Sequence, residues 1–244
     1  MANKLPRKAL IAVSSFHGPI YGGGLKTGVF FVEALHPYLV LTAAGFDVDL
    51  ASETGTFGFD DISLTPPFLS GSEHAILNNP NHPFMVGMSQ LKKASDLKKE
   101  DYGFFFASAG HAALYDYPKA KALQAIAADV WDRGGVVGTV CHGPAILPGI
   151  IDSKTGKSII AGKTVTGFMI EGELIFRILD KLRADGVVPV VEAVTAAGAY
   201  YSGAAGAFDD YSITCGRVVT GTNPASGRSA AERGVKVFDN LEPS

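Results

Sequence analysis

The chain has few cysteines and few charges, and each shortage excludes a class of protein. Its 244 residues contain two cysteines, Cys141 and Cys215, which lie 74 positions apart (215 − 141). That spacing offers neither a disulfide framework nor a C-x-x-C metal or redox site, and it favours a reducing compartment. Charged residues make up 18% of the chain, the formal net charge is -3, and there is no basic run. We therefore expect no nucleic acid and no membrane surface among its partners.

Long uninterrupted apolar runs are also missing. The longest apolar stretch, residues 27–46, contains Glu33, His36 and Pro37, so it predicts a buried helix rather than a membrane span. No apolar signal core precedes the first strand-like run, and we expect a cytoplasmic protein. Nuclear presence is compatible with this expectation if the source is eukaryotic.

The glycine fingerprints of nucleotide-binding proteins are absent as well. Residues 15–26 are rich in glycine, but they contain neither G-x-G-x-x-G nor G-x-x-x-x-G-K-[ST]. His74 and His82 show no metal-ligand spacing. The sequence therefore predicts no nucleotide site.

Strand-like and helix-like runs alternate along the rest of the chain. Strands are expected at 8–14, 46–52 and 136–140 and from residue 102, with short strands at 159–160 and 164–166, a hairpin at 211–220, and helices at 27–44, 118–133 and 229–241. This alternation predicts an α/β fold, a doubly wound, flavodoxin-like parallel sheet sandwiched by helices. Residues 185–206 are rich in Ala, Gly and Val and give no clear assignment.

A long aperiodic segment interrupts the alternation. Residues 53–101 (101 − 53 + 1 = 49) are studded with proline, asparagine and serine and show no sustained period. Because that is long for a connection, the segment predicts a partly helical cover over the site. The length of the chain then fits a single domain, 1–244, that carries this insertion.

The chain is organised around the run G-G-V-V-G-T-V-C-H-G-P-A-I, Gly134 to Ile146. It places Cys141 at the corner between a buried strand and an expected helix of about two turns, where α/β proteins position a nucleophile. Helix N–H groups behind the sulfur are expected to lower the pKa of its thiol. The alternative is a buried structural cysteine. Cys215, beside a turn with no acid or base nearby, is expected to be inert.

Three further residues are candidates for the same site. Glu33 is the one formally charged residue between Lys26 and Asp47, so we expect it to be buried and its carboxyl to take up a proton, unless it lies on a solvent strip of the helix. Ser108-Ala109-Gly110 permits close backbone approach, which makes the Gly110 amide a candidate oxyanion donor. His111 could orient a substrate or simply pack in its loop.

Several motifs together resemble the ThiJ/PfpI superfamily, and within it the glutathione-independent glyoxalases, also called glyoxalase III or D-lactate dehydratases. They are G-V-F-F-V-E-A-L-H-P (Gly28 to Pro37), F-F-A-S-A-G-H (Phe105 to His111), D-Y-P-K-A (Asp116 to Ala120), V-C-H-G-P-A (Val140 to Ala145), T-G-F (Thr166 to Phe168) with Gly172-Glu173, D-D-Y-S-I-T (Asp209 to Thr214) and V-T-G-x-N-P-A-S (Val219 to Ser226). The resemblance covers nearly the whole chain.

The resemblance implies a role for each of four residues. Cys141 would be the nucleophile, His142 its acid and base, and Glu173 the third member of a triad, with Glu171 as a rival. Glu33 would contact the cysteine sulfur. The implied reaction converts the 2-oxoaldehyde methylglyoxal, and also glyoxal, to D-lactate or glycolate with water and without cofactor or metal. The resemblance also implies a homodimer.

Three other functions fit the same residues. A stress-responsive holdase chaperone could use a low-pKa cysteine as an oxidation sensor. A cysteine peptidase or amidase could use the same triad, but it needs an open cleft. Repair of glycated proteins is hard to separate from removal of free methylglyoxal.

Overall fold

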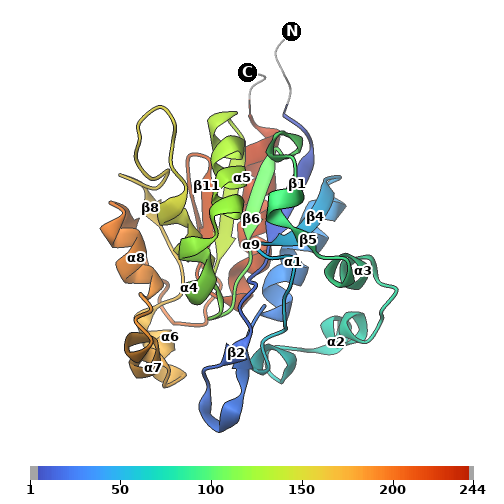
Figure 1. Ribbon diagram of the computed structural model, residues 1–244, viewed down its shortest axis with the longest axis vertical. Coiled ribbons are helices and arrows are strands. Elements are labelled where there is room, and N and C mark those ends of the chain that lie inside the picture. Colours follow the sequence, from blue (N-terminus) through green and yellow to red (C-terminus); the bar gives the residue numbers. More distant parts are fainter. Residues whose placement is uncertain (1–4, 242–244) are drawn as a thin grey trace.

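The computed structural model describes residues 5–241, and within this range the main sheet has seven strands (Figure 1). Their spatial order is β10-β11-β7-β6-β1-β4-β5. Their bounds are β1 Lys8–Ala12, β4 Asp47–Ser52, β5 Lys92–Lys93, β6 Phe104–Ala107, β7 Val136–Val140, β10 Ser212–Cys215 and β11 Val218–Gly221.

The five inner strands run parallel to one another and have the flavodoxin-like order. In chain sequence β1, β4, β6, β7 and β11 are first to fifth, so the spatial order β4-β1-β6-β7-β11 reads 2-1-3-4-5. β10 pairs antiparallel with β11 at one edge, as the predicted hairpin requires. β6 and β7 are buried along their whole length, which explains their uninterrupted apolar sequences. The predicted fold class is confirmed.

Helices cover both faces of the sheet. On one face α1 (Phe31–Ala43) and α9 (Gly227–Asp239) pack against each other, α1 over β1 and β4 and α9 over β7 and β11. Figure 1 shows α5 (Lys121–Asp132) in front of the sheet, where it contacts β6 and β7. α5 ends as predicted at a glycine, since Gly134 has a φ of 92° that other residues rarely adopt. None of the described helices is long and apolar enough to cross a bilayer.

Four local predictions are wrong. The segment after Cys141 is a 3-10 helix, η6 (Gly143–Gly149), and Pro148 inside it lacks the N–H group that an α-helix would bond at that position. The expected strand at 159–160 is a turn, and the glycine-rich loop contains a small hairpin, β2 (Gly18–Pro19) with β3 (Lys26–Thr27). α1 therefore begins at residue 31 rather than 27.

The C-terminal half carries further small elements. They are α6 (Ile170–Ile175), α7 (Leu179–Ala184), α8 (Val190–Ala196) and a two-stranded sheet of β8 (Thr164–Val165) and β9 (Tyr200–Tyr201). α8 and β9 lie in the segment that gave no assignment from sequence. Figure 1 shows β2, α6 and α7 at the end of the molecule opposite to the two chain termini.

Residues 53–101 do not act as one unit. The stretch around η2 (Ile62–Leu64) and α2 (Gly71–Leu77) lies toward the site, since Ile62 lines the cavity at Cys141. Farther along, α3 (Pro83–Ser89) packs on β4, and β5 extends the sheet edge. Only the first part of the segment therefore contributes to covering the site.

Candidate active site

The turn from β7 into η6 holds Cys141 in a conformation that non-glycine residues seldom adopt. Its φ is 58°, in the left-handed region, which costs roughly 1–2 kcal/mol for an L-residue. The turn is possible because Gly143 has no side chain: a Cβ there would come within 2.5 Å of the Ala107 carbonyl oxygen. Backbone strain at this corner is a property of nucleophile elbows, and it directs the sulfur out of the strand.

The sulfur begins a buried chain of hydrogen-bonding groups. Cys141 Sγ lies 3.2 Å from His142 Nδ1, and His142 Nε2 lies 3.0 Å from Glu173 Oε1. Glu173 belongs to the first turn of α6, and the same turn leaves Glu171 exposed to solvent. The structure therefore brings Cys141, His142 and Glu173 together, with Glu173 rather than Glu171 beside the imidazole.

The carboxylate of Glu173 fixes the tautomer of His142. A carboxylate can only accept, so His142 Nε2 carries the proton and Nδ1 is left as the acceptor that faces the sulfur. Burial and the neighbouring His111 lower the pKa of His142 to about 4, against the pull of Glu173. His142 is thus a neutral imidazole at physiological pH and can act as a base.

The expected lowering of the cysteine pKa is wrong. Burial raises the pKa of the Cys141 thiol well above its ordinary value. The thiol is 2% exposed, and the short η6 offers less favourable dipole than an α-helix would. The resting pair is therefore a thiol beside a neutral imidazole, and the thiol needs His142 as a base to become a nucleophile.

Glu33 lies in the first turn of α1 and is fully buried, as predicted from its apolar neighbours. Neither of its carboxyl oxygens has a hydrogen-bond partner of ordinary geometry within residues 5–241. Burial raises the pKa of Glu33 to about 8, while interaction with Cys141 opposes the rise. At neutral pH the carboxyl is protonated, so it can donate a proton toward the sulfur.

Gly110 occupies a position that excludes any other residue. Its φ is 133°, and a Cβ would come within 2.2 Å of the Gly28 carbonyl oxygen. Gly110 also lines the cavity at Cys141. Within the described residues, its backbone N–H forms no hydrogen bond to another residue's oxygen, so it can serve a developing oxyanion. The backbone N–H of His142 interacts with the Cys141 sulfur in the resting site, so it becomes available to an oxyanion only after the sulfur has attacked.

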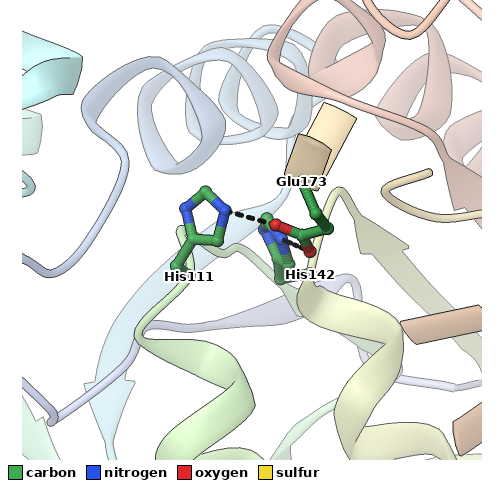
Figure 2. Close-up of side chains that lie close together, drawn as sticks. All are labelled: His111, His142 and Glu173. Atoms are coloured by element: carbon green, nitrogen blue, oxygen red, sulfur yellow. Dashed lines mark hydrogen bonds and ion pairs between the residues drawn. The ribbon is translucent and has the colours of Figure 1, made fainter. Parts of the chain in front are cut away.

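His111 packs against His142 with ring centroids 4.2 Å apart, and Figure 2 shows the Glu173 carboxylate joined to both imidazole rings. His111 Nε2 is 2.8 Å from Glu173 Oε2, and Nδ1 is 2.8 Å from the Tyr21 hydroxyl. Both ring nitrogens are thus engaged inside the protein. The predicted contact of His111 with substrate would require one of these bonds to open.

A small cavity, with room for about one water molecule, is lined by Cys141 and His142. Four phenylalanines contribute to its wall, Phe30, Phe168, Phe176 and Phe208. Phe168 lies over His142 with ring centroids 4.5 Å apart, so the base is shielded from bulk water. The cavity suits a small molecule and excludes a polypeptide segment.

Sequence reasoning missed Tyr21 and Asp60. Tyr21 comes from the glycine-rich loop and Asp60 from the aperiodic segment, and neither position carried a motif. The Tyr21 hydroxyl donates to Asp60 Oδ2 at 2.8 Å, so this pair extends the hydrogen-bonded chain beyond His111. Only the three-dimensional fold brings these loops beside the elbow.

The ligand atoms of His111, His142 and Glu173 lie within 4.8 Å of one another, a donor set of a kind that metals accept. Both Nε2 atoms, however, stand at direct hydrogen-bond distance from the carboxylate, so we assign the three residues as a hydrogen-bonded group. Cys215, the second free cysteine, is half-buried in β10 at the sheet edge.

Comparison with known proteins was made at the level of sequence and of structure. No protein-family model matches the chain. Glyoxalase 3 of Candida albicans is 47% identical over 232 residues, covering 95% of this chain and 98% of the relative. Glutathione-independent glyoxalase HSP31 of Saccharomyces cerevisiae is 46% identical, with coverage of 96% and 99%. The S. pombe relative hsp3102, also named a glutathione-independent glyoxalase, is 38% identical, with coverage of 95% and 98%.

Solved structures agree with these relatives. The crystal structure of glyoxalase III from Candida albicans has a TM-score of 0.93 at 47% identity, covering 95% of this chain and 97% of that one. A ThiJ/PfpI domain protein from Brachyspira murdochii, 13% identical with a TM-score of 0.60, shares the fold.

Proposed function

Because the chain belongs to the family of glutathione-independent glyoxalases, we propose that it converts methylglyoxal and water to D-lactate, and glyoxal to glycolate. The observation that supports this proposal most directly is the buried chain from Cys141 through His142 to Glu173, at the floor of a small aromatic cavity. It supplies a nucleophile and a base, which together suffice for an internal redox isomerisation.

The first step forms a bond between sulfur and the aldehyde carbon. Cys141 Sγ attacks C1 of methylglyoxal while its proton passes to His142 Nδ1, 3.2 Å away. The carbonyl oxygen becomes an oxyanion that the N–H groups of Gly110 and His142 stabilise, and it then takes the proton back to give a hemithioacetal. Protonated Glu33 stabilises negative charge on the sulfur during the attack.

The second step moves hydrogen from C1 to C2. A base removes the C1 proton and the oxygen of the C2 carbonyl gains a proton, which leaves an enediol bound to the sulfur. Protonation of C2 and loss of the C1 hydroxyl proton give a thioester of lactate. His142 is the base for this exchange, since it is neutral and adjacent to the sulfur, and Glu33 is its rival.

The third step is hydrolysis. Water activated by His142 attacks the thioester carbonyl, the carbon–sulfur bond breaks, and Cys141 regains its proton as lactate leaves. C1 is oxidised and C2 is reduced within one molecule, so the reaction needs no external electron carrier. The enclosed aromatic cavity favours this small substrate over the peptide or protein substrates of the alternative functions.

Two properties of the whole protein belong to the same proposal. We propose a homodimer, as the family resemblance implies, which light scattering during size-exclusion chromatography tests. We also propose a cytoplasmic location, which imaging of the tagged chain in its own host tests.

The decisive experiment is lactate formation from methylglyoxal in the absence of glutathione and in the presence of a metal chelator. D- and L-specific lactate dehydrogenases resolve the product. We expect D-lactate from the native chain and a loss of at least 10³-fold in Cys141→Ser, because a serine hydroxyl is a far weaker nucleophile than a cysteine sulfur.

Cys215→Ser is the matched control, since it removes the other free cysteine at the sheet edge, and it should retain full activity. Substantial activity in Cys141→Ser would contradict the covalent mechanism. No lactate from fully reduced native protein would overturn the proposed reaction itself.

A further inference from the structure

A continuous line of buried polar groups extends from the catalytic cysteine to the far side of His111. After Glu173 it passes through His111 to the Tyr21 hydroxyl, and from there to Asp60, with each of the three contacts 2.8 Å long. The groups come from four separate parts of the chain. Counting the protons along this line, starting from its far end, determines the state of His111.

Asp60 can only accept hydrogen bonds. Its Oδ2 receives the hydroxyls of Tyr21 and Thr27, and its Oδ1 receives the backbone N–H groups of Ile62 and Ser63. The Ala112 N–H donates to the oxygen of the Thr27 hydroxyl, and the proton of that hydroxyl is donated to Asp60. Four donors on two oxygens satisfy a carboxylate, so Asp60 carries no proton of its own.

The Tyr21 hydroxyl has a single proton, and Asp60 takes it. Burial and the charge of Asp60 raise the pKa of Tyr21 well above its ordinary value, so this proton stays in place. The 2.8 Å contact between Tyr21 and His111 Nδ1 must therefore be donated by the histidine. His111 Nδ1 is protonated for this reason.

The other nitrogen of His111 faces a carboxylate. Glu173 receives His111 Nε2 on one oxygen and His142 Nε2 on the other. Burial opposes ionisation of Glu173, but the two imidazoles that hydrogen-bond to it hold its pKa well below the ordinary value. His111 Nε2 must donate to this carboxylate as well.

We propose that His111 is a buried imidazolium, protonated on both nitrogens, which acts as a positioning residue for the catalytic pair. His111 is one of two imidazoles that donate hydrogen bonds to Glu173, and its charge keeps that carboxylate ionised. Glu173 in turn holds the proton of His142 on Nε2, so that Nδ1 stays free to accept the proton of Cys141. The two rings lie 4.2 Å apart, so the charge of His111 also disfavours a second proton on His142.

The charges around His111 are compatible with this assignment. Two carboxylates lie near the one buried cation, Glu173 in direct contact and Asp60 through Tyr21. Its remaining neighbours are Cys141 and His142 at the elbow and the edges of Phe168 and Phe176. The catalytic consequence rests on the proposed glyoxalase function, whereas the protonation state does not.

The first test is spectroscopic and uses the native chain. Nitrogen-15 NMR of protein labelled at histidine distinguishes a nitrogen that carries a proton from one that does not. At pH 7 we expect two protonated ring nitrogens on His111, and one protonated and one bare nitrogen on His142. A bare nitrogen on His111 at this pH would overturn the proposal, even if the chain makes lactate normally.

The second test measures the pH dependence of kcat/KM in His111→Gln, which keeps a polar side chain but removes the cation. In the native chain the charge of His111 opposes the effect of Glu173 on the proton affinity of His142. Without that charge the pKa of His142 should rise, so the acid limb of the kcat/KM profile should move up by about one pH unit or more. KM should change little. Tyr21→Phe, which removes the acceptor for Nδ1, should move the limb in the same direction by less.

His36→Gln is the matched control, because His36 also pairs with a carboxylate, Glu73, but lies outside the Cys141 cavity. It should leave the acid limb where it is. A role for His111 in packing alone would lower kcat in His111→Gln without moving the limb, and that result would contradict the proposal.

Discussion

Glu33 is a fully buried carboxylic acid, and its protonation makes the stability of the chain depend on pH. Its pKa is about 8 in the folded chain and near the ordinary 4.5 when unfolded. The folded state therefore holds one more proton than the unfolded state between these two values. Stability is fully present below pH 4.5 and is lost as pH rises toward 8, by up to about 1.4 kcal/mol per pH unit.

Glu33→Gln should remove this loss, because the amide does not ionise. Urea unfolding at pH 5, 7 and 8.5 should show the variant gaining stability relative to the native chain as pH rises, with no further gain above about pH 8. Activity should fall severely, since the proton near the sulfur is gone. Glu232→Gln, at an exposed position on α9, is the control. A constant difference between Glu33→Gln and native protein would show that Glu33 is not protonated at neutral pH.

Sequence alone could identify the residues of the site that carry their own signal. Cys141 stands at a strand end, and Glu33 is the one charge in a long apolar run. His142 and Glu173 were assigned through family motifs, and the structure brings all four together. Tyr21 could not be found, because hydrogen bonds between distant loops leave no local pattern.

Elements were predictable where the pattern of apolar residues was strong. β7 spans the predicted residues 136–140, and the β10–β11 hairpin spans 212–221 where 211–220 was predicted. α8 could not be assigned, because its Val- and Ala-rich sequence fits a buried strand as well as a helix. The 3-10 form of η6 was not predictable from the apolar pattern, because that pattern does not report the missing N–H group of Pro148.

The packing of α9 on the sheet depends on one small residue. At Gly234 a Cβ would come within 2.4 Å of the Phe104 ring, which is fully buried and held between Phe46 and Phe238. Gly234→Ala should therefore destabilise the chain by about 1–3 kcal/mol, despite the better helix propensity of alanine. Urea unfolding measures the change.

Gly227, at the start of the same helix, provides the control. A Cβ there meets nothing closer than 3.8 Å, so Gly227→Ala should leave stability unchanged or raise it slightly. Equal stabilities for the two variants would mean that α9 does not pack on Phe104 as described.

The catalytic cavity is a product of the whole molecule, because its aromatic wall comes from segments far apart in the chain. Phe30 precedes α1, Phe168 and Phe176 flank α6, and Phe208 lies in the loop before β10. Phe176 and Phe208 also line a second, more open groove with a volume of about 650 Å³. These two rings therefore separate the groove from the cavity at Cys141.

Phe208→Ala should join the two spaces. The ring is 39% exposed and contacts Phe176 edge to face, with centroids 5.8 Å apart, so its removal should cost little stability. The wider cavity should admit a bulky 2-oxoaldehyde such as phenylglyoxal and admit water to the base. We expect the ratio of kcat/KM for phenylglyoxal to that for methylglyoxal to rise about tenfold. Tyr200→Ala, at a 69% exposed site that lines neither space, should leave the ratio unchanged. An unchanged ratio in Phe208→Ala would mean that substrates reach Cys141 by a route that does not pass this ring.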